Sequence, residues 1–294
     1  MTTLRELLSR PEIVIAPGVY DGLTARLVEE AGFSVAYLSG ASLCYTRYAF
    51  PDIGLVSMRE VEDQLGAIRE RATIPLIVDI DTGFGNALNV ERTVRLFEQR
   101  GASALQLEDQ VTPKRCGHLK DKALIPQAEM LGKIRAALEA RRSPETLLIA
   151  RTDAIAVEGF ESALDRAEAY AEAGAEVIFV EAPRSREDLQ AIAARLSGKA
   201  KLMANMVEGG KTPLLSAGEL EALGYDLVIF PGGTVRAIAF ALRGYLASLR
   251  EHGTTTPTRG SMLDLDALNR LLGTDAFLAR GRRFDEHGRP EGSS

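Results

Sequence analysis

The sequence predicts an α/β fold, a (β/α)8 TIM barrel, with a C-terminal helical extension. Eight short apolar runs follow one another along the chain, each followed by a stretch of helical character. Eight such units in about 250 residues match the usual size of this barrel. The runs cover residues 13–19, 34–38, 76–81, 104–109, 147–153, 176–181, 201–205 and 226–230.

Most of these runs end in a polar or charged residue. A barrel of this kind carries its active site at the C-terminal ends of its strands, so the polar endings predict a catalytic site there. The acids among these endings indicate a divalent metal, and the arginine indicates an anionic substrate. The endings are Ser39, Asp79 with Asp81, Glu108 with Asp109, Arg151 with Asp153, Glu181 and Asn205.

The expected organisation is one barrel domain over residues 1–294. Residues 1–12 predict a short amphipathic helix stopped by Pro11, and residues 254–294 form a C-terminal extension. One helical stretch is expected at 263–272, and residues 280–294 are expected to be frayed or disordered. The two loops at 39–55 and 110–126 are longer than a barrel needs, which is typical of functional loops.

Composition excludes several classes of protein. The 35 basic and 41 acidic residues give a formal charge of −6, which argues against a nucleic-acid partner. No apolar run approaches the ~20 residues of a membrane span, and the N-terminus lacks the apolar core of a secretory signal. Cys44 and Cys116 form no disulfide framework. We therefore expect a cytoplasmic enzyme that acts on a small molecule.

Glycine and asparagine mark several expected helix ends. Asn89 is the expected N-cap of the helix after the third strand. Gly32, Gly101 and Gly174 are expected to end helices, each just before the next apolar run.

The triplet Asp79-Ile80-Asp81 predicts a metal site at the end of the third strand. Side chains alternate along a strand, so both carboxylates should share one face. Two inward carboxylates are costly without a cation, and Mg²⁺ is held by one or two carboxylates with substrate and water. Glu108, at the end of the next strand, strengthens the interpretation. The alternative is that one Asp caps a helix or binds a nearby Arg.

A cluster around a thiol predicts a second functional element, Lys114-Arg115-Cys116-Gly117-His118. Neighbouring positive charge lowers a thiol pKa, so Cys116 on a mobile loop could donate a proton or act as a nucleophile. The alternative is a bystander cysteine in a basic loop. Cys44 has no such neighbours and is expected to be a packing residue.

Arg151 and Asn205 end the fifth and seventh strands. The guanidinium could fork onto a substrate carboxylate, or it could pair with an inward acid such as Glu181. Asn205 could donate to a carboxylate or merely orient a loop.

These residues together resemble the isocitrate lyase and phosphoenolpyruvate mutase superfamily, in its short-chain branch, from about residue 4 to about residue 250. That branch contains methylisocitrate lyases, dimethylmalate lyases and carboxyphosphoenolpyruvate phosphonomutases. The most specific motif is EDQVTPKRCGHL at 108–119. DIDTGFGN, ARTDA, FVEAP and ANMVEGGKTP also match in order and spacing. The resemblance implies a barrel that swaps its last helix between subunits, commonly a tetramer built as a dimer of dimers. It also implies Mg²⁺, for which Mn²⁺ could substitute, and α-oxo or α-hydroxy carboxylate substrates.

The resemblance also assigns roles to positions of this sequence. Cys116 would be the general acid of a carbon–carbon lyase, protonating an enolate-like intermediate. Its catalytic neighbours would be Tyr37, Lys114, His118 and Glu108. The metal site would comprise Asp79, Asp81, Asp52 and Glu108. The substrate would contact Ser39, Gly40, Ala41, Gly117, Arg151, Glu181 and Asn205.

Some features leave the reaction open. Leu119 stands where methylisocitrate lyases typically have Arg, so a tricarboxylate would lack one expected cation. In the stretch 45–50, Arg47 could read a carboxylate instead, or the aromatic residues could line a pocket for an alkyl group. The leading reading is a lyase acting on a small 2-hydroxy di- or tricarboxylate. A phosphonomutase, an oxaloacetate decarboxylase or hydrolase, and a non-enzymatic barrel relic are the alternatives.

Overall fold

The computed structural model describes residues 2–117, 119 and 121–286. Contacts divide the chain into two compact units, Met1–Arg236 and Ala237–Ser294. The boundary falls before residue 254, the expected start of the extension, and helix α10 (Gly233–His252) spans it.

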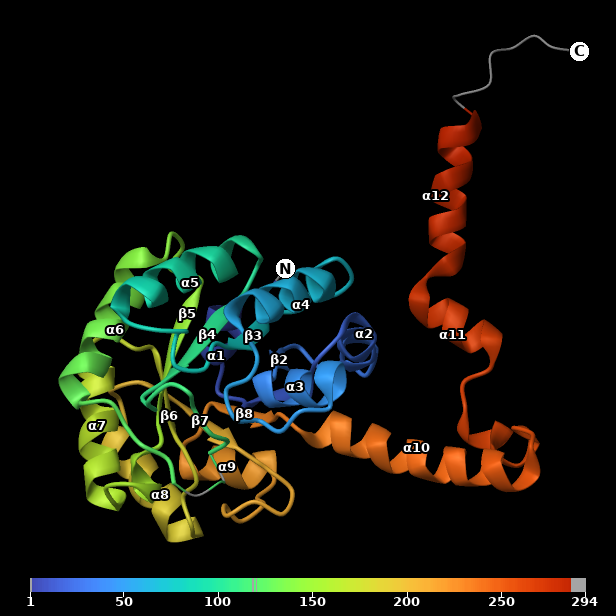
Figure 1. Cartoon of the computed structure of the whole chain (residues 1–294). Helices are drawn as coiled ribbons and strands as arrows, with labels where there is room; N and C mark the ends of the chain where they lie inside the picture. Colours follow the sequence, from blue (N-terminus) through green and yellow to red (C-terminus); the bar gives the residue numbers. More distant parts are fainter. Residues whose placement is uncertain (1, 118, 120, 287–294) are drawn as a thin grey trace, which may run out of the picture. The chain divides into compact units, whose positions relative to one another are not determined.

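The first unit is a closed barrel of eight parallel strands in sequential order, which confirms the predicted fold (Figure 1). Each expected run contains one strand, and the strands are slightly shorter than the runs in most cases. The strands are β1 (Val14–Val19), β2 (Ala36–Leu38), β3 (Leu76–Asp79), β4 (Ala104–Glu108), β5 (Leu147–Thr152), β6 (Val177–Val180), β7 (Lys201–Asn205) and β8 (Leu227–Phe230).

Helices alternate with the strands and cover the outside of the barrel (Figure 1). A large apolar core lies between the two layers, and it takes the outward side chains of the strands, such as Val78, Leu105 and Leu107. The helices are α2 (Gly22–Glu30), α3 (Gly40–Tyr48), α4 (Met58–Arg69), α5 (Ala87–Gln99), α6 (Gln127–Ala140), α7 (Phe160–Glu172), α8 (Arg186–Leu196) and α9 (Ala217–Leu223), with a 3₁₀ turn η1 (Ala154–Ala156).

A second core fills the inside of the barrel. It contains the inward side chains of the strands, for example Ile77, Ile149 and Phe179. Helix α1 (Leu4–Leu8) contributes Leu4, Leu7 and Leu8 to this core, next to the first residues of the strands. The interior of the barrel is therefore filled with apolar side chains at its N-terminal end.

Two local expectations in the barrel are wrong. The N-cap of α5 is Asn86, whose side chain accepts from the amides of Leu88 and Asn89, while Asn89 occupies the third helical position of the capping box. The segment 39–55 is not all loop, because Ser39 caps helix α3, which reaches Tyr48. The expected glycine helix ends hold, since Gly32, Gly101 and Gly174 all adopt positive φ.

The second unit consists of the rest of α10, then η2 (Thr256–Ser261), α11 (Leu265–Leu272) and α12 (Thr274–Glu286). The helix expected at 263–272 is confirmed as α11. The expectation of disorder is wrong for residues 280–286, which continue α12, since this stretch lacks proline and is rich in arginine. Residues 287–294 lie outside the described part of the chain. Within the described residues, no helix is both long and apolar enough to cross a membrane.

Candidate active site

The alternation of side chains along the strands builds the candidate site. In β4, Ala104 and Gln106 point inward while Leu105 and Leu107 face the helices, so Glu108 also points inward. The same alternation directs the side chains of the last residues of the other strands toward the barrel mouth. The polar members of this ring are Tyr37, Ser39, Asp79, Glu108, Arg151, Glu181 and Asn205.

Asp79 and Asp81 come together by a turn and not by strand alternation. Strand β3 ends at Asp79, and Asp81 adopts a left-handed conformation with φ 47°. The Asp81 amide donates to Oδ1 of Asp79 at 3.1 Å. A Cβ placed on Gly40 would lie 3.4 Å from Oδ2 of Asp79 and 3.7 Å from Oδ1 of Asp81. Both carboxyls therefore lie near the N-terminus of α3, although the expected geometry was wrong for Asp81.

Lys114 ties the loop after β4 to this acid pair. Its Nζ lies 2.6 Å from Oδ1 of Asp52 and 3.0 Å from Oδ1 of Asp81. Burial alone would lower the pKa of Lys114, but the attraction of Asp81 and Asp52 raises it well above its usual value. Burial raises the pKa of Asp81 to about 6, against the opposing pull of Lys114. Lys114 therefore serves as a fixed counter-charge.

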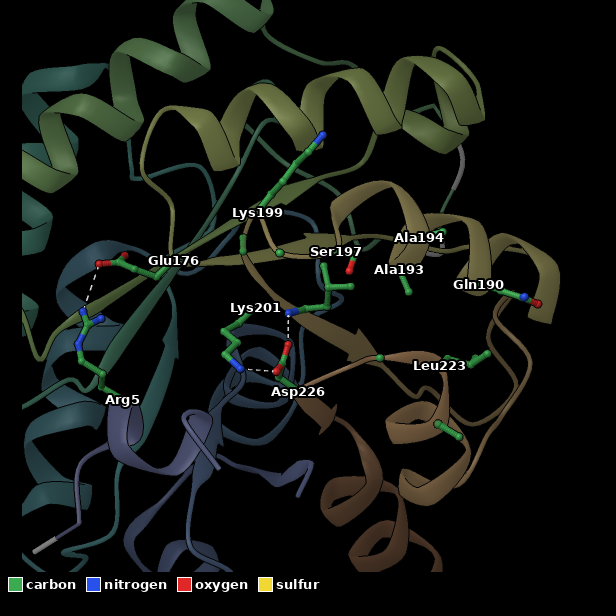
Figure 2. A pocket seen from close by; sticks show the side chains of 15 residues that line it. Arg5, Glu176, Gln190, Ala193, Ala194, Ser197, Lys199, Lys201, Leu223 and Asp226 are labelled. Atoms are coloured by element: carbon green, nitrogen blue, oxygen red, sulfur yellow. Dashed lines mark hydrogen bonds and ion pairs between the residues drawn. The ribbon is translucent and has the colours of Figure 1, made fainter. Parts of the chain in front are cut away.

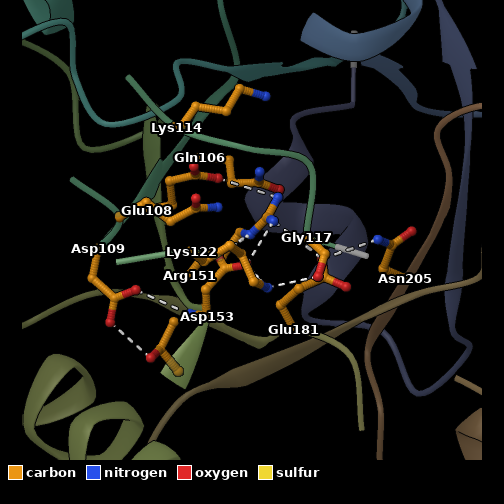
Figure 3. Close-up of polar contacts among 12 residues, drawn as sticks. Gln106, Glu108, Asp109, Lys114, Gly117, Lys122, Arg151, Asp153, Glu181 and Asn205 are labelled. Carbon is orange, nitrogen blue, oxygen red and sulfur yellow. Dashed lines mark hydrogen bonds and ion pairs between the residues drawn. The ribbon is translucent and has the colours of Figure 1, made fainter. Parts of the chain in front are cut away.

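Arg151 is the centre of a second buried network (Figure 3). Its guanidinium lies 2.9 Å from Asp153, 3.3 Å from Glu108 and 3.4 Å from Glu181. Burial disfavours the charged guanidinium, but these three acids raise the pKa of Arg151 well above its usual value. Burial raises the pKa of Glu108 well above its usual value, with Arg151 opposing. Both expected roles of Arg151 are therefore open to it, since it pairs with Glu181 and also faces the cavity.

The loop with the thiol lies over Arg151. The Cys116 amide donates to the Asp52 carbonyl at 3.1 Å. A Cβ on Gly117 would come within 2.6 Å of both Nη2 of Arg151 and Cγ of Glu181, so only glycine fits there. Lys122, whose side chain is almost fully buried, donates to the Gly117 carbonyl at 2.6 Å and to Asp153 at 2.7 Å. His118, expected beside Cys116, lies outside the described residues.

These groups line one small cavity of about 70 Å³ at the barrel mouth. Ser39 and Ala41 reach it from the start of α3, where the first helical amides lack partners within the helix and favour an anion. Asn205 lines it with its amide nitrogen 3.2 Å from Oε2 of Glu181. The lining includes Tyr37, Ser39, Ala41, Asp52, Asp79, Lys114, Cys116, Gly117, Arg151, Glu181 and Asn205.

The donor set fits a hard cation such as Mg²⁺. Five carboxyls around the cavity are buried, and Asp81 is partly so, whereas the buried cations that the structure describes beside them are Lys114, Lys122 and Arg151. Neither oxygen of Glu108 accepts a hydrogen bond from a residue that the structure describes, although Arg151 forms an ion pair with it. In the described part of the chain no three acidic, histidine or cysteine side chains converge as a ready-made cage. Mg²⁺ does not need one, because it keeps several waters.

Sequence reasoning missed several lining residues. Gln106 accepts a hydrogen bond of 3.0 Å from the Tyr37 hydroxyl inside the barrel. The alternation of side chains along β4 could have predicted that Gln106 points inward. Arg236 lines the cavity, but nothing in its local sequence indicates this, whereas Tyr45 lines it as one of the two alternatives for the stretch 45–50 allowed. Arg47 does not line it; its guanidinium lies over the Tyr48 ring, 5.5 Å from the centroid. Cys44 is buried as expected and contacts the Pro51 carbonyl.

A larger groove of about 770 Å³ lies at the opposite end of the barrel (Figure 2). Its charged residues pair with one another, Arg5 with Glu176 and Lys201 with Asp226. Lys201 begins β7 and Asp226 precedes β8, so the groove lies at the N-terminal ends of the strands, where barrels do not keep their catalytic groups.

Comparison with known proteins agrees with this geometry. The family described as phosphoenolpyruvate phosphomutase matches residues 4–250. The chain belongs to this family. It is 42% identical to a 2,3-dimethylmalate lyase of Eubacterium barkeri, over 92% of this chain and 93% of the relative. It is 49% identical to a 2-methylisocitrate lyase of Aeropyrum pernix, over 85% of this chain and 80% of the relative.

Solved structures of family members superpose closely. Oxaloacetate acetylhydrolase in complex with 3,3-difluorooxalacetate gives a TM-score of 0.90 at 35% identity, covering 96% of each chain. Phosphonopyruvate hydrolase in complex with oxalate and Mg²⁺ gives 0.86 at 33% identity, covering 96% of this chain and 97% of that one. The sequence-based assignment to this superfamily is confirmed, and the relatives named as lyases support the predicted enzyme class.

Proposed function

We propose that this protein is a Mg²⁺-dependent carbon–carbon lyase. It cleaves a small 2-hydroxy di- or tricarboxylate, of the alkylmalate or methylisocitrate type, into an α-oxo acid and a carboxylate. The observation that carries the proposal is the convergence in one cavity of the Cys116 thiol, the Arg151 guanidinium and the Asp79 carboxyl. Such a cavity can bind an anion, stabilise developing charge and deliver a proton.

The residues divide the reaction between them. The substrate hydroxyl loses its proton to a base, and the bond between the hydroxyl-bearing carbon and its neighbour breaks. The electron pair moves to the carbon beside the second carboxylate, and the Cys116 thiol donates the proton that forms the C–H bond. Arg151 stabilises the developing negative charge in a site that excludes water. Tyr37 is no base, because burial raises its pKa well above the usual value and its hydroxyl donates to Gln106.

The metal would be held by Asp79 and Asp81 directly or through water, with Asp52 and Glu108 in support. When bound, Mg²⁺ acts as a Lewis acid that stabilises negative charge on substrate oxygens. A related solved structure contains Mg²⁺ with oxalate, which supports this choice of ion. Mn²⁺ has the same ligand preference and could substitute.

Two other reactions of the family are weaker candidates. A phosphonomutase would need a dense cluster of cations to bind a phosphoryl group, whereas two of the three cations in the described lining, Lys114 and Arg151, are each tied to two or more acids. An oxaloacetate hydrolase would use the same binding groups on a smaller diacid, and a solved relative has that activity in its name. The proposed enzyme is cytoplasmic and homo-oligomeric, with a dimer of dimers as the expected assembly.

The proposal is tested by a substrate screen with Mg²⁺ that detects the released α-oxo acid. The panel comprises alkylmalates, methylisocitrate, isocitrate and oxaloacetate, with carboxyphosphoenolpyruvate as the test for mutase activity. Release of an α-oxo acid from an alkylmalate or methylisocitrate is the expected result. Turnover of carboxyphosphoenolpyruvate alone would overturn the lyase proposal.

The same assay measures the role of the thiol. Cys116→Ser should lower cleavage by about 10²–10⁴-fold, because serine is a much weaker acid than cysteine. Binding of the substrate should survive, since Arg151 and the acid pair are unchanged. Cys44→Ser is the matched control, because Cys44 is buried outside the cavity lining. Equal turnover in wild type and Cys116→Ser would mean that the thiol is not the acid.

A further inference from the structure

Three described cations line the catalytic cavity, and they differ in how firmly they are held. Lys114 contacts two acids, Asp52 and Asp81, and Arg151 contacts three. Arg236, at the start of α10, forms one ion pair with a described residue, in which its Nη1 lies 2.6 Å from Oε2 of Glu208. That pair is solvent-exposed, with side-chain exposures of 46% and 45%.

This difference determines which cation can change partners. Drawing Arg151 away from its acids would leave buried charges unpaired, which is strongly unfavourable. An exposed pair such as Arg236–Glu208 contributes little, on the order of 0–1 kcal/mol, so Arg236 can leave it easily. A substrate carboxylate could form a bidentate contact with the guanidinium inside the cavity, where the pair would be less exposed to solvent.

The surroundings of Arg236 place its guanidinium close to the cavity wall. A Cβ on Gly232, itself a lining residue, would come within 2.6 Å of Nη1 of Arg236. Tyr45 lines the cavity too, and its pKa is raised to about 12 by burial and by Asp52 and Cys116, while Arg236 opposes the rise. Tyr45 therefore lies within electrostatic reach of both the thiol and this guanidinium.

We infer that Arg236 binds the second carboxylate of the substrate and so makes the enzyme specific for dicarboxylates. This inference rests on the proposed function. The α-oxo acid half would occupy the side of the cavity with Ser39 and Asp79, and the other carboxylate would face Arg236. Apolar lining from Val207, Ile229 and Pro231 leaves room there for a short alkyl group and provides no charge for a third carboxylate.

Binding measurements separate the two halves of the site. The probes are oxalate, which fills only the α-oxo acid half, and 3,3-difluorooxaloacetate, which adds a second carboxylate. Calorimetry with Mg²⁺ gives both dissociation constants for wild type, Arg236→Gln, Glu208→Gln and Arg186→Gln. Arg186 is the matched control, because its pair with Glu219 has similar exposure, 46% and 48%, and lies outside the cavity lining.

Arg236→Gln should weaken binding of 3,3-difluorooxaloacetate at least about tenfold and change oxalate binding less than about twofold, as expected for loss of one charged hydrogen-bonded contact. Glu208→Gln should leave or improve binding of the diacid, because it removes the competing carboxylate. The inference would be overturned, and the proposed function left standing, if wild type and Arg236→Gln bound the diacid equally or if Arg236→Gln weakened the binding of both probes equally. If oxalate fails to bind wild type, the proposed function fails and the inference with it.

Discussion

At the scale of single residues, the candidate site is a set of buried charges arranged around a position for a cation. Among the described residues its acids outnumber its fixed cations, so the acids compete for basic partners. Asp153 has two partners, and although burial raises its pKa, Arg151 and Lys122 outweigh this and hold it at about 2. Cations stabilise the charged forms of Asp81 and Glu108 less well, so burial raises the pKa values of both. If the proposed divalent ion binds here, it should relieve this imbalance, and the site should be less stable without it.

The pH dependence of stability should show this cost. The pKa of Asp81 rises from 3.8 to about 6 on folding, so the folded state binds more protons in this range. The contribution of Asp81 to the free energy of unfolding of the metal-free protein should therefore be greatest below pH 4. It should fall by up to about 3 kcal/mol as the pH rises through 6. Glu108 acts in the same direction, because burial raises its pKa well above the usual value.

Thermal unfolding with and without Mg²⁺ measures this effect. The increase in Tm on adding Mg²⁺ should be larger at pH 7.5 than at pH 5, because Asp81, with a pKa of about 6, is mainly ionised only at the higher value. Asp81→Asn should reduce both the loss of stability on raising the pH and the response to Mg²⁺. A Mg²⁺ response that is the same at both pH values, or unchanged in Asp81→Asn, would contradict a metal site at this acid.

At the scale of elements, the segment between β4 and α6 brings the thiol to the barrel mouth. The described residues of 110–126 form an isolated bridge between Gln110 and Leu124 and a few backbone hydrogen bonds, such as that from the Cys116 amide to the Asp52 carbonyl. Two buried lysines add side-chain contacts. Lys114 anchors it to Asp52 before the thiol, and Lys122 anchors it to Asp153 after the thiol. Because Asp153 also holds Arg151, the loop and the guanidinium share one anchor.

Replacing Lys122 by Met should release the loop without unfolding the barrel. Asp153 keeps Arg151 as its partner, so no buried carboxylate loses all its cations. The Cys116 thiol should then react with iodoacetamide at least about tenfold faster, as expected when a buried pair that closes the loop is lost. Peptide mapping separates Cys116 from Cys44.

Lys199→Met is the control for this measurement, since Lys199 pairs with Glu168 on the barrel surface. An alkylation rate of Cys116 that stays at the wild-type value in Lys122→Met would show that Lys122 does not hold the loop.

At the scale of the whole molecule, the sequence predicts the barrel well because the barrel depends on repeated local signals. Alternation within strands, helix caps and terminal glycines are all visible in short windows. The inward ring at the strand ends follows from the same period. Asp81 shows the limit, because its position depends on a left-handed turn and not on the strand. Arg236 shows a second limit, since only the closure of β8 onto β1 brings the chain after residue 230 to the mouth.

The C-terminal unit bears on the assembly of the molecule, which we predict to be an oligomer whose subunits exchange their ends. The unit exposes many large apolar side chains, including Phe240 at 82%, Leu265, Phe277 and Phe284. Monomeric proteins rarely expose so many apolar side chains in one segment, and such surfaces usually contact another chain. The full-length protein should therefore sediment as an oligomer at micromolar concentration.

Phe240→Asp should weaken this association, because a buried carboxylate at an interface has no partner and costs several kcal/mol. Leu88→Asp is the matched control, since Leu88 is 73% exposed on α5 of the barrel unit and should leave the sedimentation coefficient unchanged. Sedimentation velocity of the three proteins at equal concentration makes the comparison. A wild-type monomer, or an equal loss of oligomer in both variants, would refute the assignment of the interface to the C-terminal unit, because an interface located there must respond to Phe240 and not to Leu88.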